Sequence, residues 1–304
     1  NVTAHSKDIK ENFEAMEGEE VAIAGRIMRK RIMGKAAFFD VQDKQGRIQC
    51  YIKRDDIGVD EYKIFKTYDI GDIVGLRGFV FKTRTDEVSV HTQELTLLAK
   101  SLQVLPDKWS GLQDIDLRYR QRYVDLIMNE DVRETFYNRA KIVKTVREVL
   151  EEDYGFLEVE FNTHHNALDF DLKLRISLEL PLKRLIVGGL DRVYELGKVF
   201  RNEGMDKNHS PEFTSMEAYM AYGNLEDMMD LMEQVVYKCA MAVNGSPIIT
   251  YEGKSFDVTP PWNKIDMTET VIKVTGIPFD KIDDDEEARA AAIKYGMNEE
   301  DVKN

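Results

Sequence analysis

The sequence predicts an α+β protein in which a small closed β-barrel of the OB type is followed by a mixed domain of helices and strands. Five short apolar runs, separated by turn-forming residues, fall within residues 21–90, which is typical of a five-stranded barrel. Beyond residue 130, apolar residues recur at helical spacing and short strand-like runs lie between the helical segments. A length of 304 residues agrees with about two domains.

The barrel strands are expected at residues 21–27, 37–41, 48–52, 73–80 and 88–90. Gly34 and residues 43–46, 69–72 and 83–86 supply the turns between them. Residues 60–68 suit one helix between the third and fourth strands, where this fold commonly has one. We expect the first domain at 1–105, a polar linker at 106–129 and the second domain at 130–304.

The second domain is expected to begin with a long helix. Its apolar positions recur at steps of four and three, at Val132, Phe136, Ala140, Val143, Val146 and Leu150. Asn129 can cap its start, and Gly155 ends it. The following segments predict strands at 156–160, 174–176, 192–196 and 215–221 and helices at 180–187, 225–243 and 280–304.

Composition excludes several classes of protein. Cys50 and Cys239 are isolated, so a disulfide scaffold and a Cys-type zinc site are not expected, and a reducing compartment fits. No apolar run approaches the roughly 18 residues of a transmembrane helix, and the first residues do not resemble a signal peptide. We therefore expect a cytoplasmic protein that does not bind a membrane.

Charge is unevenly distributed. The net charge of −14 argues against a protein that binds nucleic acid over its whole surface. Residues 24–54, however, contain nine Lys or Arg against two Asp, with aromatic residues between them. On a barrel this pattern favours a local nucleic-acid surface, although a solvated basic face is the alternative.

The segment from Val199 to Thr214 carries the residues most suited to chemistry. Arg201 and Glu203 are two apart, so on a strand they would share a face; a polar loop with Lys207 and His209 follows, and Phe213 opens the next strand. These side chains suit a nucleotide, with cations for phosphate, a carboxylate for an exocyclic amine and a ring for base stacking. A surface hairpin with one salt bridge would explain them about as well.

Several phrases resemble the class II aminoacyl-tRNA synthetases. F-R-N-E at 200–203, H-S-P-E-F at 209–213 and T-S-M-E-A-Y at 214–219 resemble motif 2 of that family. The closest similarity is to its lysyl group in subgroup IIb, and it is carried by G-R-I-M-R-K-R-I-M-G-K-A-A-F, L-R-Y-R-Q-R-Y-V-D-L and T-H-H-N-A-L-D. The resemblance implies an OB-fold anticodon-binding domain and a class II antiparallel-sheet catalytic domain. It also implies ATP-dependent activation of lysine and its transfer to tRNA(Lys).

The resemblance assigns a role to each matching residue. For ATP, Arg201 would be the catalytic residue on the α-phosphate, with Glu203 on the adenine amino group, Phe213 on the ring and His209 on the outer phosphates. For the amino acid, Arg201 would bind the carboxylate and Glu179 the α-ammonium, and Glu217 and Tyr219 would line the side-chain pocket. The anticodon would be bound by Arg26, Phe38, Gln49 and Glu94.

The family's remaining parts are not matched within the chain. Motif 3 and the Mg²⁺ ligands are expected beyond residue 304, so the 304 residues alone are expected to be incomplete for activity. The family's substrate loop is not found after Glu160, and His164 with His165 lacks the partners of a metal site. The helix from Val132 and the strand to Glu160 would be motif 1, which implies a homodimer.

Three alternatives remain open at this stage. An aspartate- or asparagine-specific synthetase of the same subgroup is disfavoured, because Glu217 suits a cationic side chain rather than a carboxylate or an amide. The other two are a non-catalytic module that only binds tRNA and a scaffold that acts through dimerisation. The presence of Arg201, Glu203 and Phe213 argues against both.

Overall fold

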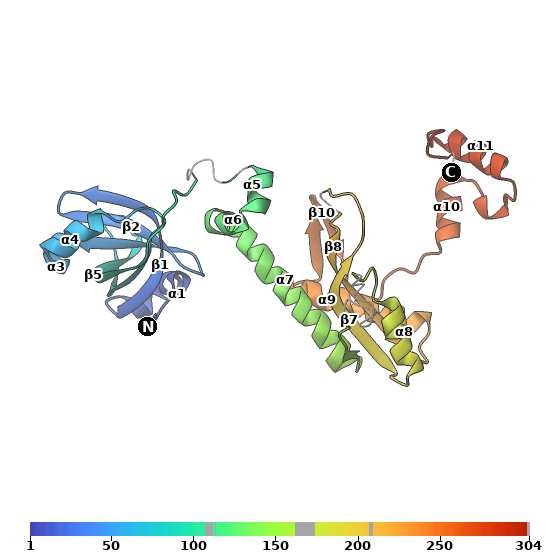
Figure 1. The fold of residues 1–304 in the computed structure, drawn as a ribbon, viewed down its shortest axis with the longest axis horizontal. Helices are drawn as coiled ribbons and strands as arrows, with labels where there is room; N and C mark the ends of the chain where they lie inside the picture. Colours follow the sequence, from blue (N-terminus) through green and yellow to red (C-terminus); the bar gives the residue numbers. More distant parts are fainter. Residues whose placement is uncertain (107–111, 113, 162–173, 207–208, 303–304) are drawn as a thin grey trace, which may run out of the picture. The chain divides into compact units, whose positions relative to one another are not determined.

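The computed structural model divides into two compact units, Asn1–Arg133 and Glu134–Asn304 (Figure 1). It describes residues 1–106, 112, 114–161, 174–206 and 209–302. Each unit has its own buried apolar residues.

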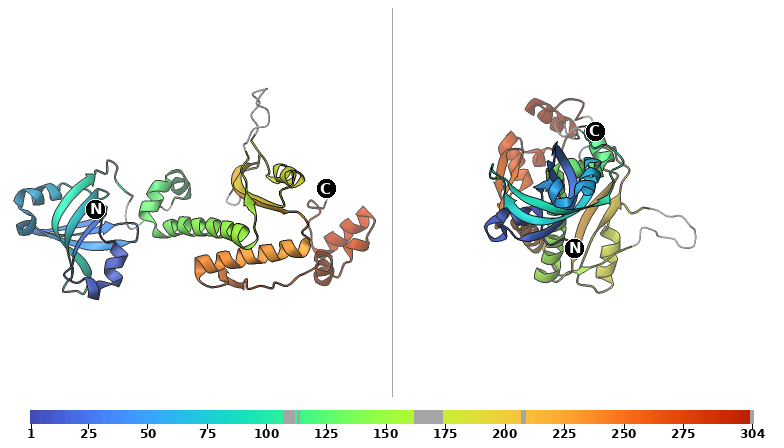
Figure 2. Two further views of the ribbon diagram at one scale, coloured as in Figure 1. Left: turned by 90° about the horizontal axis from the view of Figure 1, so that it is seen from below. Right: turned by 90° about the vertical axis from the view of Figure 1, so that its left-hand side faces the viewer.

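The first unit contains the five-stranded barrel that the sequence predicts (Figure 2). Its strands close in the order β1-β2-β3-β5-β4; they are β1 (Glu20–Met33), β2 (Ala36–Gln42), β3 (Arg47–Lys53), β4 (Ile73–Lys82) and β5 (Val88–Ala99). The strand β1 is longer than expected because it pairs with β4 along its first half and with β2 along its second. A bulge between Ile27 and Arg29 lets it bend from one partner to the other.

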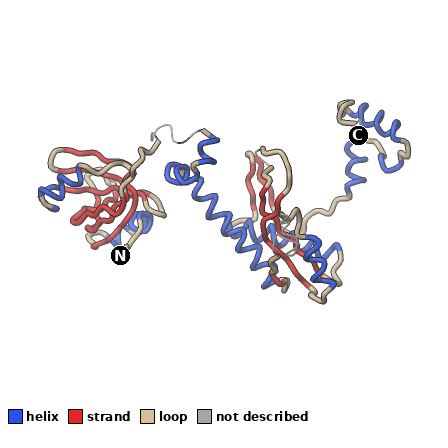
Figure 3. Tube along the Cα trace, in the orientation of Figure 1, coloured by secondary structure: helices blue, strands red, loops and turns tan. Residues whose placement is uncertain are grey.

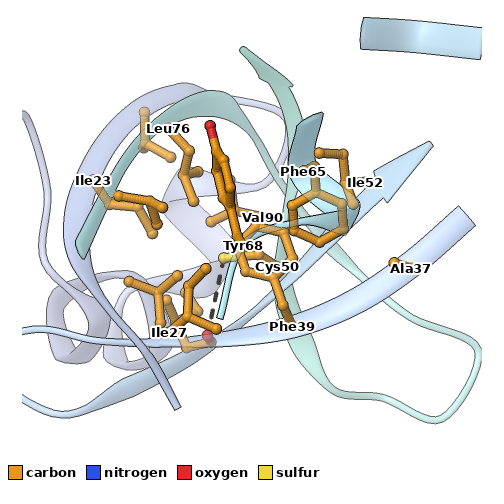
Figure 4. Close-up of a cluster of buried hydrophobic side chains, with 14 of the residues drawn as sticks. Ile23, Ile27, Ala37, Phe39, Cys50, Ile52, Phe65, Tyr68, Leu76 and Val90 are labelled. Carbon is orange, nitrogen blue, oxygen red and sulfur yellow. Dashed lines mark hydrogen bonds between the residues drawn. The ribbon is translucent and has the colours of Figure 1, made fainter. Parts of the chain in front are cut away.

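Alternate residues of the strands fill the barrel interior (Figure 4). Phe39, Cys50, Ile52 and Val90 are fully buried there, and burial raises the pKa of the Cys50 thiol. The predicted helix between the third and fourth strands is confirmed as α4 (Val59–Lys66), which supplies the buried Tyr62 and Phe65. Three short helices were not predicted, namely α1 (Ser6–Glu11), α2 (Phe13–Met16) and α3 (Arg54–Ile57).

Two further helices of the first unit, α5 (Ile115–Arg120) and α6 (Arg122–Met128), follow the barrel along the chain. They are held around Asp125, which is buried and accepts hydrogen bonds from Arg118 Nε (2.9 Å) and Asn129 Nδ2 (2.6 Å) and pairs with Arg122. Burial alone would raise the pKa of Asp125, but these donors outweigh it and the pKa lies below its usual value.

The second unit begins within α7 (Glu130–Glu148), which continues as a π-helical turn, η1 (Val149–Asp153) (Figure 3). The predicted stop at Gly155 is confirmed, and this glycine has a φ of 68°. The second unit contains a three-stranded sheet with the order β6-β7-β8. In it, β6 (Leu157–Glu158) runs parallel to β7 (Arg192–Phe200), and β8 (Glu212–Met220) runs antiparallel to β7.

Helices cover both faces of this sheet. On one face, Tyr194 packs with Leu150 of η1 and Leu231 of α9 (Leu225–Asn244). On the other face, α8 (Glu179–Val187) packs on the hairpin through Leu182. The predicted helices at 180–187 and 225–243 are thereby confirmed.

Other predictions for this unit were wrong. Residues 174–176 are not a strand, because their backbone runs irregularly and donates to no sheet partner among the described residues. The strand at 156–160 shrinks to β6, and the helix at 280–304 shrinks to α11 (Asp285–Tyr295), which Asp284 caps and Gly296, with a φ of 115°, ends. A hairpin of β9 (Ile248–Tyr251) and β10 (Lys254–Asp257), the helix α10 (Met267–Thr275) and the turn η2 (Phe279–Lys281) were not predicted. Across the described residues, no helix combines the length and apolarity needed to cross a bilayer.

Candidate functional site

The hairpin of β7 and β8 places three of the predicted substrate residues, Phe213, Glu217 and Tyr219, on the face covered by α8, which we call the α8 face. Opposite residues of an antiparallel pair point to the same side of the sheet. The α8 face is therefore defined by four pairs, Val193 with Tyr219, Glu195 with Glu217, Gly197 with Ser215 and Val199 with Phe213. Its apolar residues pack against Leu178 and Leu182.

Arg201 lies directly after the last residue of β7. Its backbone N–H donates to Pro211 O (2.9 Å), its Nε donates to Ile176 O (3.1 Å), and its guanidinium lies 5.4 Å from the centroid of the Phe213 ring. A cation over an aromatic face is attracted by the ring quadrupole. Arg201 and Phe213 are therefore neighbours, as the nucleotide interpretation requires.

Glu203 does not share a strand face with Arg201, so that prediction was wrong. The strand ends at Phe200, and Glu203 N donates to Arg201 O (3.0 Å), which turns the chain out of the ladder. His209 is exposed but held by Asp206, whose carboxylate accepts from His209 N (2.7 Å) and lies 2.7 Å from His209 Nδ1. Lys207, like His164 and His165, lies outside the described residues.

Both carboxylate oxygens of Glu217, on the α8 face, accept hydrogen bonds. Its Oε1 accepts from the backbone N–H of Leu178 (3.1 Å), and its Oε2 accepts from the Tyr219 hydroxyl (3.0 Å). Burial, and then the hydrogen bond to Glu217, raise the pKa of Tyr219 to about 12. Tyr219 is thus a neutral donor near pH 7, and the negative charge stays on Glu217.

Lys183 is a neighbour of the site that sequence reasoning missed. Its Nζ lies 2.6 Å from Glu179 Oε1 and 5.7 Å from the centroid of the Tyr219 ring. The spacing of Glu179 and Lys183, four residues apart on α8, is the signal that could have found the pair. The ammonium group of Lys183 therefore lies near both Glu179 and Tyr219, two residues predicted to bind the amino acid.

In the barrel, Phe38 and Gln49 lie close together on the outer surface. Phe39 is fully buried, which confirms Phe38 as the outward ring. Gln49 is opposite Asp40, two residues along the same strand face from Phe38. A polar cavity of about 300 Å³ adjoins Gln49 and is lined also by Arg29, Asp40 and Arg47.

The other two residues predicted for the anticodon lie apart from this pair. Arg26 is opposite Gln42, four residues along β2 from Phe38, and its guanidinium donates to Gly71 O (2.6 Å). Glu94 lies on β5 beyond the last β3–β5 pair, and its carboxylate is 4.0 Å from Arg77 Nε. The structure thus brings together Phe38 and Gln49 but not all four residues.

A row of rings across four strands, β2, β3, β5 and β4, was also missed. Phe38 is opposite Tyr51, Tyr51 is opposite His91, and the ring of Phe79 stacks on His91 at a centroid distance of 4.7 Å. We call Phe38, Tyr51, His91 and Phe79 the aromatic row. Alternation with buried residues on each strand is the signal that could have found it, because residues two apart share a face.

The basic residues near this row do not all point to solvent. Lys30 is used internally, because its Nζ donates to Lys66 O (3.1 Å) and to Tyr68 O, and it lies over the Phe65 ring. Arg31 is exposed and is opposite Phe38. Arg31 is thus the cation better placed beside the aromatic row.

Comparison with known families agrees with both halves of this description. Residues 114–304, more than half of the chain, match the family of class II tRNA synthetases (D, K and N), and residues 21–104 match an OB-fold nucleic-acid-binding domain. The chain belongs to the class II tRNA synthetases. Its fold is an N-terminal OB domain followed by a class II synthetase domain.

Several proteins similar to this chain are named lysine–tRNA ligase. A lysine–tRNA ligase of Moorella thermoacetica is 50% identical over 97% of this chain and 63% of its own length. Those of Thermoanaerobacter pseudethanolicus and Clostridium botulinum are 52% and 51% identical, over 96% and 95% of this chain and 61% and 60% of their own lengths. This synthetase chain spans about three fifths of the length of the curated relatives it matches.

A Mg²⁺ site does not form among the described residues of this class II synthetase. No group of three or more His, Cys, Asp or Glu side chains gathers there as a metal would require. The carboxylate of Glu179, on α8, is already paired with Lys183, and that of Glu217, on the α8 face, accepts from Leu178 N–H and the Tyr219 hydroxyl. These residues therefore do not fit a divalent cation.

Proposed function

We propose that this protein activates lysine with ATP and transfers it to tRNA(Lys), in the cytoplasm. The observation that carries the proposal is Glu217, a negative charge ordered on the α8 face by Leu178 and Tyr219 and matched to a cationic side chain. The names of the relatives, which are about 50% identical to this chain, support lysine as the substrate.

The reaction would be an in-line attack of the amino-acid carboxylate on the α-phosphorus of ATP. Arg201 would bind both reacting groups and neutralise the negative charge that develops between them. Phe213 would stack on the adenine and Glu203 would accept from its amino group. Catalysis would then come from positioning and charge neutralisation rather than from a protein nucleophile. The ligands of Mg²⁺ would be residues outside the part of the chain that the structure describes.

The α-ammonium of lysine would bind Glu179. That carboxylate is paired with Lys183 in this structure, so the α-ammonium of the substrate must replace the Lys183 ammonium at Glu179. Exchange of like for like conserves the local charge, and an exposed pair of this type is worth only about 0–1 kcal/mol. Lys183 therefore does not oppose binding strongly.

The deciding test is amino-acid-dependent exchange of pyrophosphate into ATP by the full-length protein, with lysine, arginine, aspartate and asparagine in turn. We expect exchange with lysine only. Aspartate would bring two carboxylates together at Glu217, and at 4 Å with an effective dielectric near 20 the repulsion is about 4 kcal/mol. Exchange with aspartate or asparagine and none with lysine would overturn the proposal, and tRNA binding without any exchange would favour a non-catalytic module.

Adenine recognition should depend on Phe213. Stacking of a base on an aromatic ring is worth about 1–3 kcal/mol, so Phe213→Ala should weaken ATP binding about 5- to 150-fold in a calorimetric titration. Glu203→Gln should reduce the preference for ATP over GTP. Phe256→Ala, at a half-exposed ring on β10, is the matched control and should bind ATP like the parent. Parental affinity in the Phe213 variant would contradict this assignment.

The barrel is proposed to bind the anticodon through Phe38 and Gln49. Phe38→Ala should weaken binding of the cognate anticodon stem-loop about 5- to 150-fold and reduce its preference over a stem-loop with a changed central base. Arg31→Ala should weaken both stem-loops alike and lower the slope of log K against log salt by about 1. Equal losses of preference in the two variants would leave only non-specific electrostatic binding.

We also propose a homodimer built on α7. Phe136 and Tyr137 are 50% and 55% exposed, and Ile142 is exposed on the same helix, while Val146 is buried in the unit's own core. Large exposed apolar side chains at neighbouring positions on one helix support a surface that a second copy of the chain covers.

A further inference from the structure

The segment Arg175 to Leu178 contacts two of the four proposed amino-acid-binding residues and leads into a third. The backbone O of Ile176 accepts from Arg201 Nε (3.1 Å), and the N–H of Leu178 donates to Glu217 Oε1 (3.1 Å). The next residue, Glu179, opens α8. The position of this short segment therefore sets Arg201, Glu217 and Glu179 relative to one another.

Arg175 anchors the segment to β7. Its backbone O accepts from Phe200 N (2.8 Å), and its guanidinium donates from Nε to Lys198 O (2.7 Å) and from Nη1 to Phe161 O (3.1 Å). The side chain is 12% exposed. The planar guanidinium fork serves several partners at fixed angles, which the single ammonium of a lysine does not.

Gly197 makes room for this anchor. A Cβ at residue 197 would lie 2.3 Å from Arg175 Nη2, closer than any side chain tolerates. The glycine sits in the middle of the β7 ladder, where its missing side chain would otherwise weaken the strand. Its presence is explained by the guanidinium that lies over it.

Glu195 is the ion-pair partner of Arg175 and lies deep in the site. It is 2% exposed, its Oε1 pairs with Arg175 Nη1, and its Oε2 is buried without a hydrogen-bond partner in the part of the chain that the structure describes. Directly across the hairpin is Glu217. Like charges opposite each other on a sheet are destabilising, so the positive charge of Arg175 is needed where two carboxylates meet.

We propose that the Arg175–Glu195 pair positions the amino-acid pocket and determines its specificity. Arg175 cancels the charge of Glu195, so that Glu217 alone carries the net negative charge that meets the substrate's side-chain ammonium. The same guanidinium holds the segment that orders Glu217 and Glu179. The pair acts through these residues without touching substrate, and the proposal rests on the proposed lysine activation.

The test uses steady-state pyrophosphate exchange by the full-length protein. Glu195→Gln keeps an acceptor for Arg175 but leaves its charge uncompensated, so the lysine KM should rise about tenfold while the ATP KM stays within about twofold. Arg175→Lys keeps the positive charge beside Glu195 but loses the planar fork that donates to Lys198 O and Phe161 O. The lysine KM of this variant should therefore also rise, because the segment that orders Glu217 and Glu179 is no longer held.

A matched control lies on the other face of the same hairpin, where Glu212 pairs with Lys198 at 3.1 Å. Glu212→Gln should leave both KM values unchanged. An unchanged lysine KM in Glu195→Gln or in Arg175→Lys would overturn the proposal. Parallel losses of lysine and ATP affinity in Glu195→Gln would overturn it too, because they indicate general damage to the hairpin. Failure of the parent to exchange with lysine would instead refute the proposed function.

Discussion

Replacing Glu217 by glutamine is expected to raise the lysine KM by roughly a thousandfold. The amide keeps the size of the side chain; its oxygen can accept from Leu178 N–H and its nitrogen can donate to the Tyr219 hydroxyl oxygen, so the pocket keeps its shape. Only the charge is lost, and a unit charge pair at 4 Å with an effective dielectric near 20 is worth about 4 kcal/mol. Steady-state exchange with varied lysine measures the effect.

The same variant should bind ATP almost as the parent does, because the nucleotide is assigned to Arg201 and Phe213. Tyr219→Phe removes the hydroxyl that Glu217 accepts from but leaves the charge, so a much smaller rise in the lysine KM is expected. If both variants lost lysine and ATP affinity in parallel, Glu217 would be holding the fold of the hairpin rather than selecting the substrate.

Replacing Arg201 by lysine is expected to lower kcat by about 10²–10³, the usual loss when a preorganised donor to transition-state charge is removed. Lysine retains the positive charge, but it cannot bind a carboxylate and a phosphate with one planar fork. It also loses the Nε hydrogen bond to Ile176 O. Single-turnover formation of the adenylate, at saturating lysine and ATP, separates this effect from weaker binding.

Arg289→Lys, at an exposed arginine of α11, provides the matched control and should leave the rate unchanged. A variant of Arg201 with parental kcat and a raised KM for ATP alone would show that this side chain binds the ground state only. In that case charge neutralisation would have to come from other residues.

The barrel could be predicted almost completely from the sequence. Its strands alternate between core and surface, as at Phe38 and Phe39, and Gly34 marks a turn between two of them. The short helices α1, α2 and α3 were missed, and the strand lengths were wrong, because β1 is shared between two partners through a bulge that leaves no periodic signal.

The proposed catalytic residues were assigned through resemblance rather than through spacing. The interpretation that placed Arg201 and Glu203 on one strand face failed, since a strand end is decided by the partner strand and not by the residue types themselves. Lys183 was missed for a similar reason, because its contact with Tyr219 joins a helix to a strand 36 positions away in the sequence.

By itself the sequence determined the closed barrel, the main helices of the second domain and the side chains that suit ATP and a cationic amino acid. These follow from local periodicity, turn residues and family motifs, which lie in short stretches of chain. Only the tertiary structure decided that Glu195 faces Glu217, that Gly197 leaves space for Arg175 and that residues 175–178 contact the site without forming a strand. The register of the strands and the docking of residues 175–178 arise from contacts between distant segments. A shift of one residue in either strand would turn its glutamate, Glu195 or Glu217, to the opposite face.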